Sequence, residues 1–255
     1  MPREYKVALS PSTAPNTTLT TVVYRNAVYF FAAILLCAIW GFWPTYYSNP
    51  LQVSDYYVHA HGVMLTLWCI TLVAQGYLVR SGRRDIHRQV GKTAFILAPM
   101  VFLSTLAVIH NGVDASNERG VFLLAVTLNN VLLFGITAGL GFYHRREPAV
   151  HARYMLCTVL PMFAPIFGRI IRQLGAEMEF IPQVGGRPAL QIVSYVGSDG
   201  ILLALAIWDW VSHRRLRVFP VLFAVYAITH LALFAVYDQP FWAAFAQWFK
   251  SLPLT

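Results

Sequence analysis

The amino-acid sequence predicts an all-α membrane protein, a polytopic helical bundle with seven transmembrane helices. Of the 255 residues, 57% are hydrophobic and only 12% are charged, which is more apolar surface than a soluble core of this size can bury. Seven apolar runs of about 20 residues follow one another, each long enough to cross a bilayer as a helix. These runs lack the alternating pattern of strands, so they favour helices over a β-barrel.

The seven predicted spans cover residues 24–44, 57–79, 92–110, 120–143, 153–171, 190–211 and 217–236. Proline is expected to kink two of them, at Pro99 in the third span and at Pro161 and Pro165 in the fifth. The absence of a Cys-x-x-Cys spacing favours packing roles for the three cysteines, which all lie inside spans: Cys37, Cys69 and Cys157.

The two ends of the chain differ from the spans. Residues 1–23 are polar and rich in Ser, Thr and Pro, and they lack the layout of a cleavable signal, which predicts a flexible cytoplasmic tail. Residues 237–255 are expected to form an outer interfacial segment, with a short amphipathic helix over 239–252 anchored by Trp242 and Trp248. A contact with a membrane-protein partner is the alternative role for this helix. The membrane domain is predicted to occupy residues 24–236.

The basic residues alternate with the spans. Fourteen of the 19 Lys and Arg residues fall in the tail and in the loops near residues 80–92, 145–153 and 214–217. By the positive-inside rule these loops face the cytoplasm, the amino terminus is inside and the carboxyl terminus is outside, which requires an odd number of spans. Since the basic residues border the spans, we expect them to contact the lipid bilayer and not nucleic acid.

Polar side chains inside the spans are the candidate functional residues, because an ionisable group in the membrane costs several kcal/mol unless it is paired or hydrated. Most are expected in the outer half of the bundle, where they would form a polar cluster of His, Asp and Asn side chains. Toward the outer side lie His61, His110, Arg169 and His230, and nearer the midplane lie Asn129, Asn130 and Asp199.

His59 and His61 occupy the start of the second span. Residues two apart on an α-helix point about 200° apart, so the two rings cannot chelate one ion from a regular helix. We expect His61 to face inward on the same face as Gln75. His59 is expected at the membrane interface, on a lipid-compatible face with Gly62 and Thr66.

Asp199 in the sixth span has several interpretations that the sequence leaves open. It fits a proton relay, a metal ligand, a counter-ion to Arg169, or a structural hydrogen bond to Asn129, Asn130 or Ser194. The neighbouring small residues, Gly197, Ser198 and Gly200, predict close approach of another helix.

Two inner loops resemble each other, since each places a basic pair and then a histidine before an apolar helix. His87 and His151 therefore enter the membrane at matching positions of different helices, in loops or at helix ends. One interpretation is a cap that contacts lipid headgroups. The other is that these histidines ligate a cofactor or pair across the bundle with His144 or His213.

The set of motifs over residues 57–250 resembles a family of uncharacterised bacterial multi-pass inner-membrane proteins. The motifs are His61 and Gly62 with Trp68 and Gln75; Gly82 and Arg83 with His87, Arg88 and Gly91; Arg145, Arg146 and Pro148; His151 and Arg153 to Leu156; Asp199; and the closing segment from Trp242 to Trp248. The resemblance implies a helical bundle in a bacterial inner membrane. The basic loops that end in histidine are also similar to those of cytochrome b561-like proteins, whose paired helix histidines hold b-type haem.

Three functions remain as hypotheses. A redox protein binding haem b would use His61 or His110 with His230, and His87 with His151. A metal-dependent membrane enzyme would use a transition metal held by His61, His110, His230 and Asp199. The third is an accessory or small-ligand-binding membrane protein, which the sequence favours because it carries no nucleotide loop and no nucleophile elbow.

Overall fold

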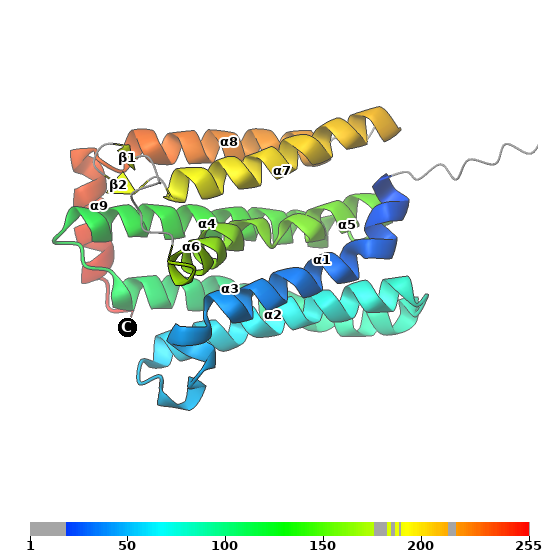
Figure 1. The fold of residues 1–255 in the computed structure, drawn as a ribbon, viewed down its shortest axis with the longest axis horizontal. Helices are drawn as coiled ribbons and strands as arrows, with labels where there is room; N and C mark the ends of the chain where they lie inside the picture. Colours follow the sequence, from blue (N-terminus) through cyan, green and yellow to red (C-terminus); the bar gives the residue numbers. More distant parts are fainter. Residues whose placement is uncertain (1–18, 176–182, 185–186, 189, 214–217, 255) are drawn as a thin grey trace, which may run out of the picture.

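The computed structural model describes residues 19–175, 183–184, 187–188, 190–213 and 218–254 and shows an elongated bundle of helices that run along one axis (Figure 1). The helices are α1 (Leu19–Gly41), α2 (Tyr56–Arg80), α3 (Arg84–Gly112), α4 (Glu118–Tyr143), α5 (Pro148–Cys157), α6 (Phe163–Gln173), α7 (Leu190–His213), α8 (Val218–Val236) and α9 (Pro240–Ser251). Three single turns complete the helical part: η1 (Trp43–Tyr47), η2 (Pro50–Gln52) and η3 (Leu160–Met162). A small antiparallel hairpin pairs β1 (Gln183–Val184) with β2 (Arg187–Pro188). The prediction of a helical membrane bundle is confirmed.

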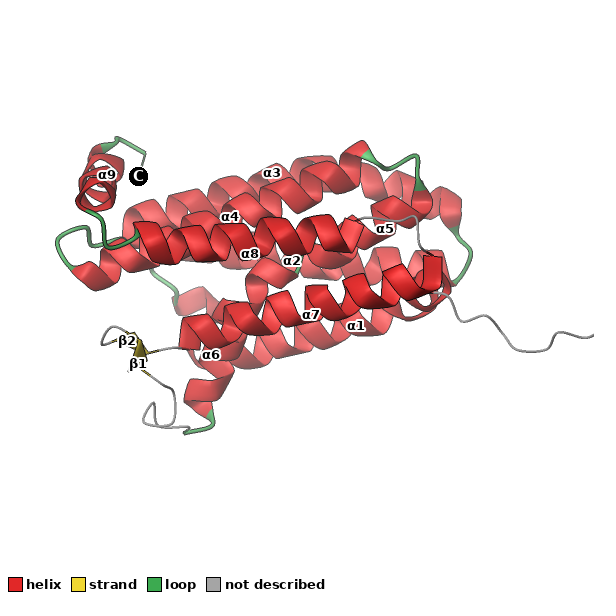
Figure 2. Ribbon diagram, turned by 90° about the horizontal axis from the view of Figure 1, so that it is seen from above, coloured by secondary structure: helices red, strands yellow, loops and turns green. Residues whose placement is uncertain are grey.

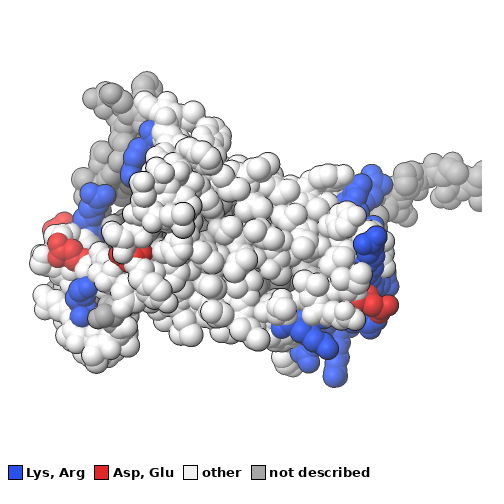
Figure 3. Space-filling view, turned by 90° about the horizontal axis from the view of Figure 1, so that it is seen from below, with Lys and Arg blue, Asp and Glu red and all other residues white. Residues whose placement is uncertain are grey.

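Six helical stretches of the described residues are long and apolar enough to cross a membrane: α2, α3, α4, the stretch Pro148–Gln173, Gln191–Ser212 of α7, and α8. The apolar stretch of α1 that runs from Arg25 to Gly41 is shorter than these six. Figure 3 shows a broad surface without charged residues between two charged ends of the bundle. A lipid bilayer is the solvent that suits such a band.

The bundle has two ends, which we name by their elements. At the α9 end, α1, α3, α6 and α8 finish and α2, α4 and α7 begin. At the α2–α3 end, α2, α4 and α7 finish and α3, α5 and α8 begin. The α2–α3 end exposes a run of arginines: Arg80, Arg83, Arg84, Arg88, Arg145 and Arg146. Residues 1–18 of the expected tail and Arg214, Arg215 and Arg217 lie outside the described residues, while α1 already begins at Leu19, within the expected tail.

The fifth predicted span is divided into two helices. Helix α5 ends at Cys157, η3 contains Pro161, and α6 begins at Phe163, so the expected kink is a break in the helix. A proline has no N–H to donate, and the carbonyls that are left free need other partners. The Tyr226 hydroxyl of α8 donates to the Cys157 carbonyl at 3.4 Å and meets part of this need. Pro99, in contrast, lies within the continuous helix α3.

Helix α9 crosses the end of the bundle instead of continuing along it (Figures 1 and 2). Its Ala246 and Phe249 pack against Val121 and Leu124 of α4, and the Trp242 indole N–H donates to the Val121 carbonyl at 3.2 Å. Lys250 donates to the carbonyls of His110 and Asn111 at 2.8 and 3.0 Å. These carbonyls end α3, where a cation is favoured by the helix dipole. The helix expected over 239–252 is therefore present and packs on its own chain.

Candidate functional site

A cavity of about 220 Å³ lies near the α9 end, between α1, α2, α6 and the turn η1. Its wall is mostly apolar, and its polar side chains come from α2, α6 and η1. The lining residues are Leu35, Ala38, Phe42, Thr45, Tyr46, Tyr47, Val58, His61, Gly62, Leu65, Thr66, Cys69, Met162, Pro165, Ile166 and Arg169. Small-molecule sites have this character, an apolar wall with a few convergent polar groups.

Helices α1 and α6 approach closely beside the cavity. A Cβ atom on Gly41 would lie 2.9 Å from the backbone oxygen of Ile166, so only glycine permits this approach. The Gln173 side-chain amide donates to the carbonyls of Gly41 and Trp40 at 2.8 and 3.1 Å, which joins the end of α6 to the end of α1. This contact fixes the position of Arg169, one turn earlier on α6.

Arg169 is a half-buried cation on the cavity wall. Its guanidinium donates to the Pro165 carbonyl at 3.0 Å and lies 4.2 Å from the centre of the Phe42 ring. Within the described part of the chain, no carboxylate forms an ion pair with it. A guanidinium has five N–H donors and pairs readily with carboxylate or phosphate, so Arg169 has donors left for an anion.

His61 of α2 also lines the cavity and contacts α3, so it points into the bundle as expected. Its Nδ1 is 3.4 Å from the Thr105 hydroxyl of α3, and that hydroxyl donates its proton to the Val101 carbonyl at 2.7 Å. The Thr105 oxygen therefore accepts from Nδ1–H of His61. This leaves Nε2 of the neutral ring as a hydrogen-bond acceptor.

The part of α2 around His59, Gly62 and Thr66 is covered by η1, so these residues contact protein side chains and do not form an open lipid-facing surface. The Tyr46 ring lies over Gly62, where a Cβ atom would be 2.7 Å from it, and the Tyr46 hydroxyl is 3.3 Å from Nδ1 of His59. The Tyr47 hydroxyl bonds the Thr66 hydroxyl at 2.7 Å, which in turn donates to the Gly62 carbonyl at 2.6 Å. Burial raises the pKa of Tyr47 above its ordinary value, so this phenol stays a donor. Tyr47 and Thr66 therefore satisfy each other, and Arg169 and His61 are the basic side chains that line the cavity.

The four residues predicted to share a transition metal do not assemble. Among the described residues, no three His, Cys, Asp or Glu side chains come close enough to hold one ion. His61 contacts Thr105, the buried His110 ring packs edge-on against Phe249 of α9 at 5.2 Å, and His230 pairs with Asp199. These side chains come from helices that pack against different neighbours. A similar depth in the membrane therefore does not bring them together.

Asp199 and His230 form the second polar group of the bundle. Oδ2 of Asp199 is 3.0 Å from Nδ1 of His230, so the carboxylate is paired with His230 and not with Arg169. Tyr195 stacks on the His230 ring with 3.8 Å between centroids. Asn129 of α4 is a neighbour of the Tyr195 hydroxyl, whereas no contact between Asn130 and Asp199 is found. A Cβ atom on Gly197 or Gly200 would meet nothing within 4 Å, so no helix of the described chain approaches there.

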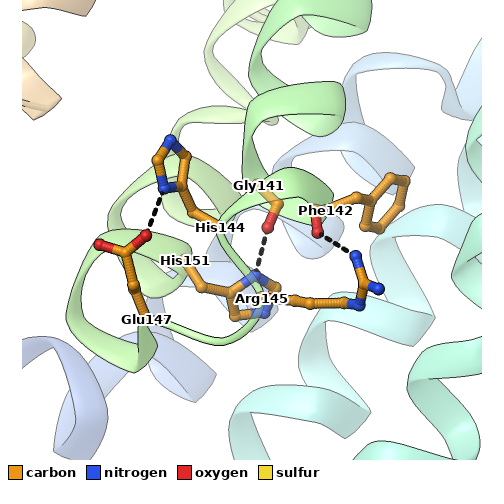
Figure 4. A network of polar contacts seen from close by, with 6 residues as sticks. All are labelled: Gly141, Phe142, His144, Arg145, Glu147 and His151. Carbon is orange, nitrogen blue, oxygen red and sulfur yellow. Dashed lines mark hydrogen bonds and ion pairs between the residues drawn. The ribbon is translucent and has the colours of Figure 1, made fainter.

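The α2–α3 end holds a third group, which includes His87 and His151. These rings are 6.5 Å apart and nearly perpendicular, and both residues lie in the first turn of their helices, α3 and α5, as expected. His151 donates from Nδ1 to the Gly141 carbonyl at 2.7 Å, whereas His144 contacts Glu147 at 2.8 Å (Figure 4). The side chain of His213 lies outside the described residues.

Gln75 belongs to this α2–α3 end and not to the cavity. Its side-chain oxygen and nitrogen are both buried without a hydrogen-bond partner, as is Nδ1 of His87. The amide of Gln75 lies next to Gly91 of α3, where a Cβ atom would be 3.6 Å away. Sharing a face with His61 did not bring Gln75 to the same site, because the two residues are 14 positions apart along α2.

Sequence reasoning missed the most buried ion pair in the described structure. Arg153, which was counted among the basic loop residues, is fully buried on α5 and forms two hydrogen bonds with Asp209 of α7, at 2.6 and 3.1 Å. The Arg153 guanidinium also donates to the Ala149 carbonyl at 2.8 Å. The available signal was Asp209 itself, an acid between two tryptophans in the apolar run of the sixth predicted span.

No family model, curated protein or solved structure matches this chain. The geometry of the described residues is therefore the basis for the functional proposal.

Proposed function

We propose that this protein is a small-ligand-binding integral protein of a bacterial inner membrane, and that the cavity near the α9 end is its binding site. The supporting observation is Arg169, a half-buried cation on an apolar cavity wall with no carboxylate partner among the described residues. A buried cation is costly unless an anion or several hydrogen-bond acceptors accompany it. A ligand with an anionic head and an apolar body satisfies both the guanidinium and the wall.

The size of the cavity limits the ligand. About 220 Å³ is available, which is somewhat more than the roughly 150 Å³ that holds benzene in an engineered apolar cavity and less than the ~300 Å³ at the lower end of drug-sized pockets. A single ring or a short chain with one carboxylate fits this space. Phe42, Tyr46 and Tyr47 supply aromatic surface for its apolar part.

Benzoate and benzamide are matched probes for this proposal, because they have the same size and differ in charge. We expect benzoate to raise the thermal unfolding temperature of the purified protein in nonionic detergent, since binding to the folded state stabilises it. Benzamide, which offers no anion to Arg169, is expected to have a much smaller effect. Equal shifts for the two probes, or no shift with either, would count against an anion-binding cavity.

The same proposal includes seven spans, with α1 as the first, the amino terminus in the cytoplasm and the carboxyl terminus outside. The arginines exposed at the α2–α3 end support this orientation through the positive-inside rule. The cavity, near the α9 end, then lies in the outer half of the membrane. The uncharged surface between the two ends of the bundle is then in contact with the lipid bilayer.

A cysteine-labelling experiment tests this orientation. A cysteine in place of Leu254 is expected to react with a membrane-impermeant maleimide in intact spheroplasts, and one in place of Ser81 only after permeabilisation. The background is low because Cys69 and Cys157 are buried and Cys37 is half-buried. Labelling of the Leu254→Cys protein only after permeabilisation would reverse the assignment.

A second candidate function rests on His87 and His151, which would act as axial ligands of a b-type haem. Their rings come from different helices, lie 6.5 Å apart at an interplanar angle of 83°, and retain nitrogen atoms for a metal: Nε2 of His151, whose Nδ1 binds Gly141, and the buried Nδ1 of His87. A haem would supply reversible one-electron chemistry. We expect a Soret band that shifts on dithionite reduction and is lost in His151→Ala but kept in His144→Ala. Haem-supplemented expression without such a band would exclude this candidate.

A further inference from the structure

The interface of α4, α7 and α8 contains a buried polar cluster that the proposed ligand site does not use. It consists of Asp199, Tyr195 and Gln191 on α7, His230 on α8 and Asn129 on α4. Only 3% of Tyr195 and 4% of His230 is exposed, and the Asp199 side chain is 20% exposed. The cluster joins α7 and α8, which are consecutive in the sequence, to α4, which is not.

The cluster has more polar atoms than hydrogen bonds. Asp199 and His230 share one hydrogen bond of 3.0 Å, and Tyr195 and Tyr226 pack on the His230 ring at centroid distances of 3.8 and 5.8 Å. Four other polar atoms are buried without a partner: Oδ1 of Asp199, the hydroxyl of Tyr195, Nδ2 of Asn129 and Nε2 of Gln191. Asn129 and Gln191 are the polar neighbours of the Tyr195 hydroxyl, although neither completes a hydrogen bond with it.

Such a group of buried donors and acceptors fits ordered water. A buried water typically makes about three hydrogen bonds to polar groups that would otherwise lack partners, and bridging water is nearly as favourable as a direct hydrogen bond. The carboxylate oxygen accepts, the two amide nitrogens donate, and the tyrosine hydroxyl does both. Ordered water supplies the donors and acceptors that these atoms lack, whereas the apolar neighbours Val126 and Leu233 offer none.

The net charge of the cluster depends on whether the Asp199–His230 pair holds a proton. The titratable groups that face the Asp199–His230 pair are the phenols of Tyr195 and Tyr226 and, beyond Tyr226, the thiol of Cys157; α4 contributes the neutral Asn129. Within the described residues, no Lys or Arg pairs with Asp199. An ionised Asp199 beside a neutral His230 would leave a net charge of −1 in the membrane, which is expensive. One added proton removes that net charge while the hydrogen bond between the two side chains is kept.

We propose that Asp199 and His230 form a proton-binding site that takes up and releases one proton through water held by Tyr195, Asn129 and Gln191. In the bound form, the proton is shared by the carboxylate and the imidazole, which together carry no net charge. In the released form, the proton leaves through the water to solvent at the α9 end, where α8 ends. This site is independent of the ligand cavity at Arg169, so either proposal can fail without the other.

Infrared difference spectroscopy across a pH titration tests the site on the purified full chain. We expect carboxyl and imidazole bands that change together with pH in the wild type, and we expect both to be lost in Asp199→Asn and in His230→Gln. Asp85→Asn, which changes an exposed carboxylate paired with Arg88, is the matched control and is expected to leave these bands unchanged. An Asp199→Asn spectrum identical to the wild type would overturn the proposal.

Tyr195→Phe is the second variant, because it keeps the ring that packs on His230 and removes only the hydroxyl. If Asp199→Asn and His230→Gln do not fold, this variant still distinguishes a proton-binding site from a purely structural pair. We expect Tyr195→Phe to shift the midpoint of the paired titration and to remove a water O–H band that is sensitive to ¹⁸O-water. Unchanged midpoint and water bands would show that the hydroxyl holds no water at this site, and would overturn the proposed route for the proton.

Discussion

Replacement of Arg153 by methionine is expected to lower the free energy of unfolding by about 3–5 kcal/mol, because it removes the guanidinium that pairs with the buried Asp209 carboxylate. Arg153 and Asp209 are fully buried and joined by hydrogen bonds of 2.6 and 3.1 Å. Asp209→Leu is expected to have a similar effect, because it removes the carboxylate that pairs with the buried Arg153 guanidinium. Unfolding of the purified protein in mixed micelles of increasing SDS fraction measures the difference.

Two controls separate the loss of the pair from the loss of a side chain. The double variant Arg153→Met/Asp209→Leu removes both charges and is expected to recover much of the loss, since a buried pair contributes less than the cost of breaking it. Arg88→Met breaks an exposed pair with Asp85 and is expected to cost about 0–1 kcal/mol. A loss for Arg153→Met no larger than for Arg88→Met would contradict this description of the pair.

Arg169→Gln is expected to weaken benzoate binding by roughly 10-fold to 100-fold, since hydrogen bonds to charged groups contribute about 1.5–3 kcal/mol. Glutamine keeps a polar N–H donor but is shorter than arginine and has no charge. Titration calorimetry with benzoate in nonionic detergent measures the change in affinity. The matched control is Arg172→Gln, which removes an exposed arginine less than one turn further along α6 and is expected to leave affinity within about twofold. Equal losses for Arg169→Gln and Arg172→Gln would point to a general charge effect and not to the cavity.

The parts of the fold that depend on local sequence were predictable. Apolar runs of helical length gave α2, α3, α4 and α8, because a helix must be about 20 apolar residues long to cross the hydrocarbon core. The break between α5 and α6 follows from Pro161, and α9 follows from the aromatic segment after Gln239. These features depend on residues that are neighbours in sequence.

The parts that depend on which helices touch were not predictable from one sequence. His61 and His230 were expected to converge, but α2 packs with α1 and α3, whereas α8 packs with α7 and α4. The α2 surface around His59 is covered because η1 folds back over Gly62. The spacing of the residues from Trp43 to Tyr47 does not distinguish such a turn from an aromatic anchor at the membrane interface. The Arg153–Asp209 pair joins α5 and α7 through residues 56 positions apart, and no local pattern in the sequence predicts which helices meet there.

The measurement that tests the central proposal most directly is anomalous diffraction from crystals of the protein soaked with 4-bromobenzoate. We predict a bromine peak inside the cavity between α1, α2 and α6, with the carboxylate within hydrogen-bond distance of the Arg169 guanidinium, and no peak there in Arg169→Gln crystals. A bromine peak at other sites only, or an occupied cavity in which the carboxylate points away from Arg169, would contradict a ligand site organised by this arginine.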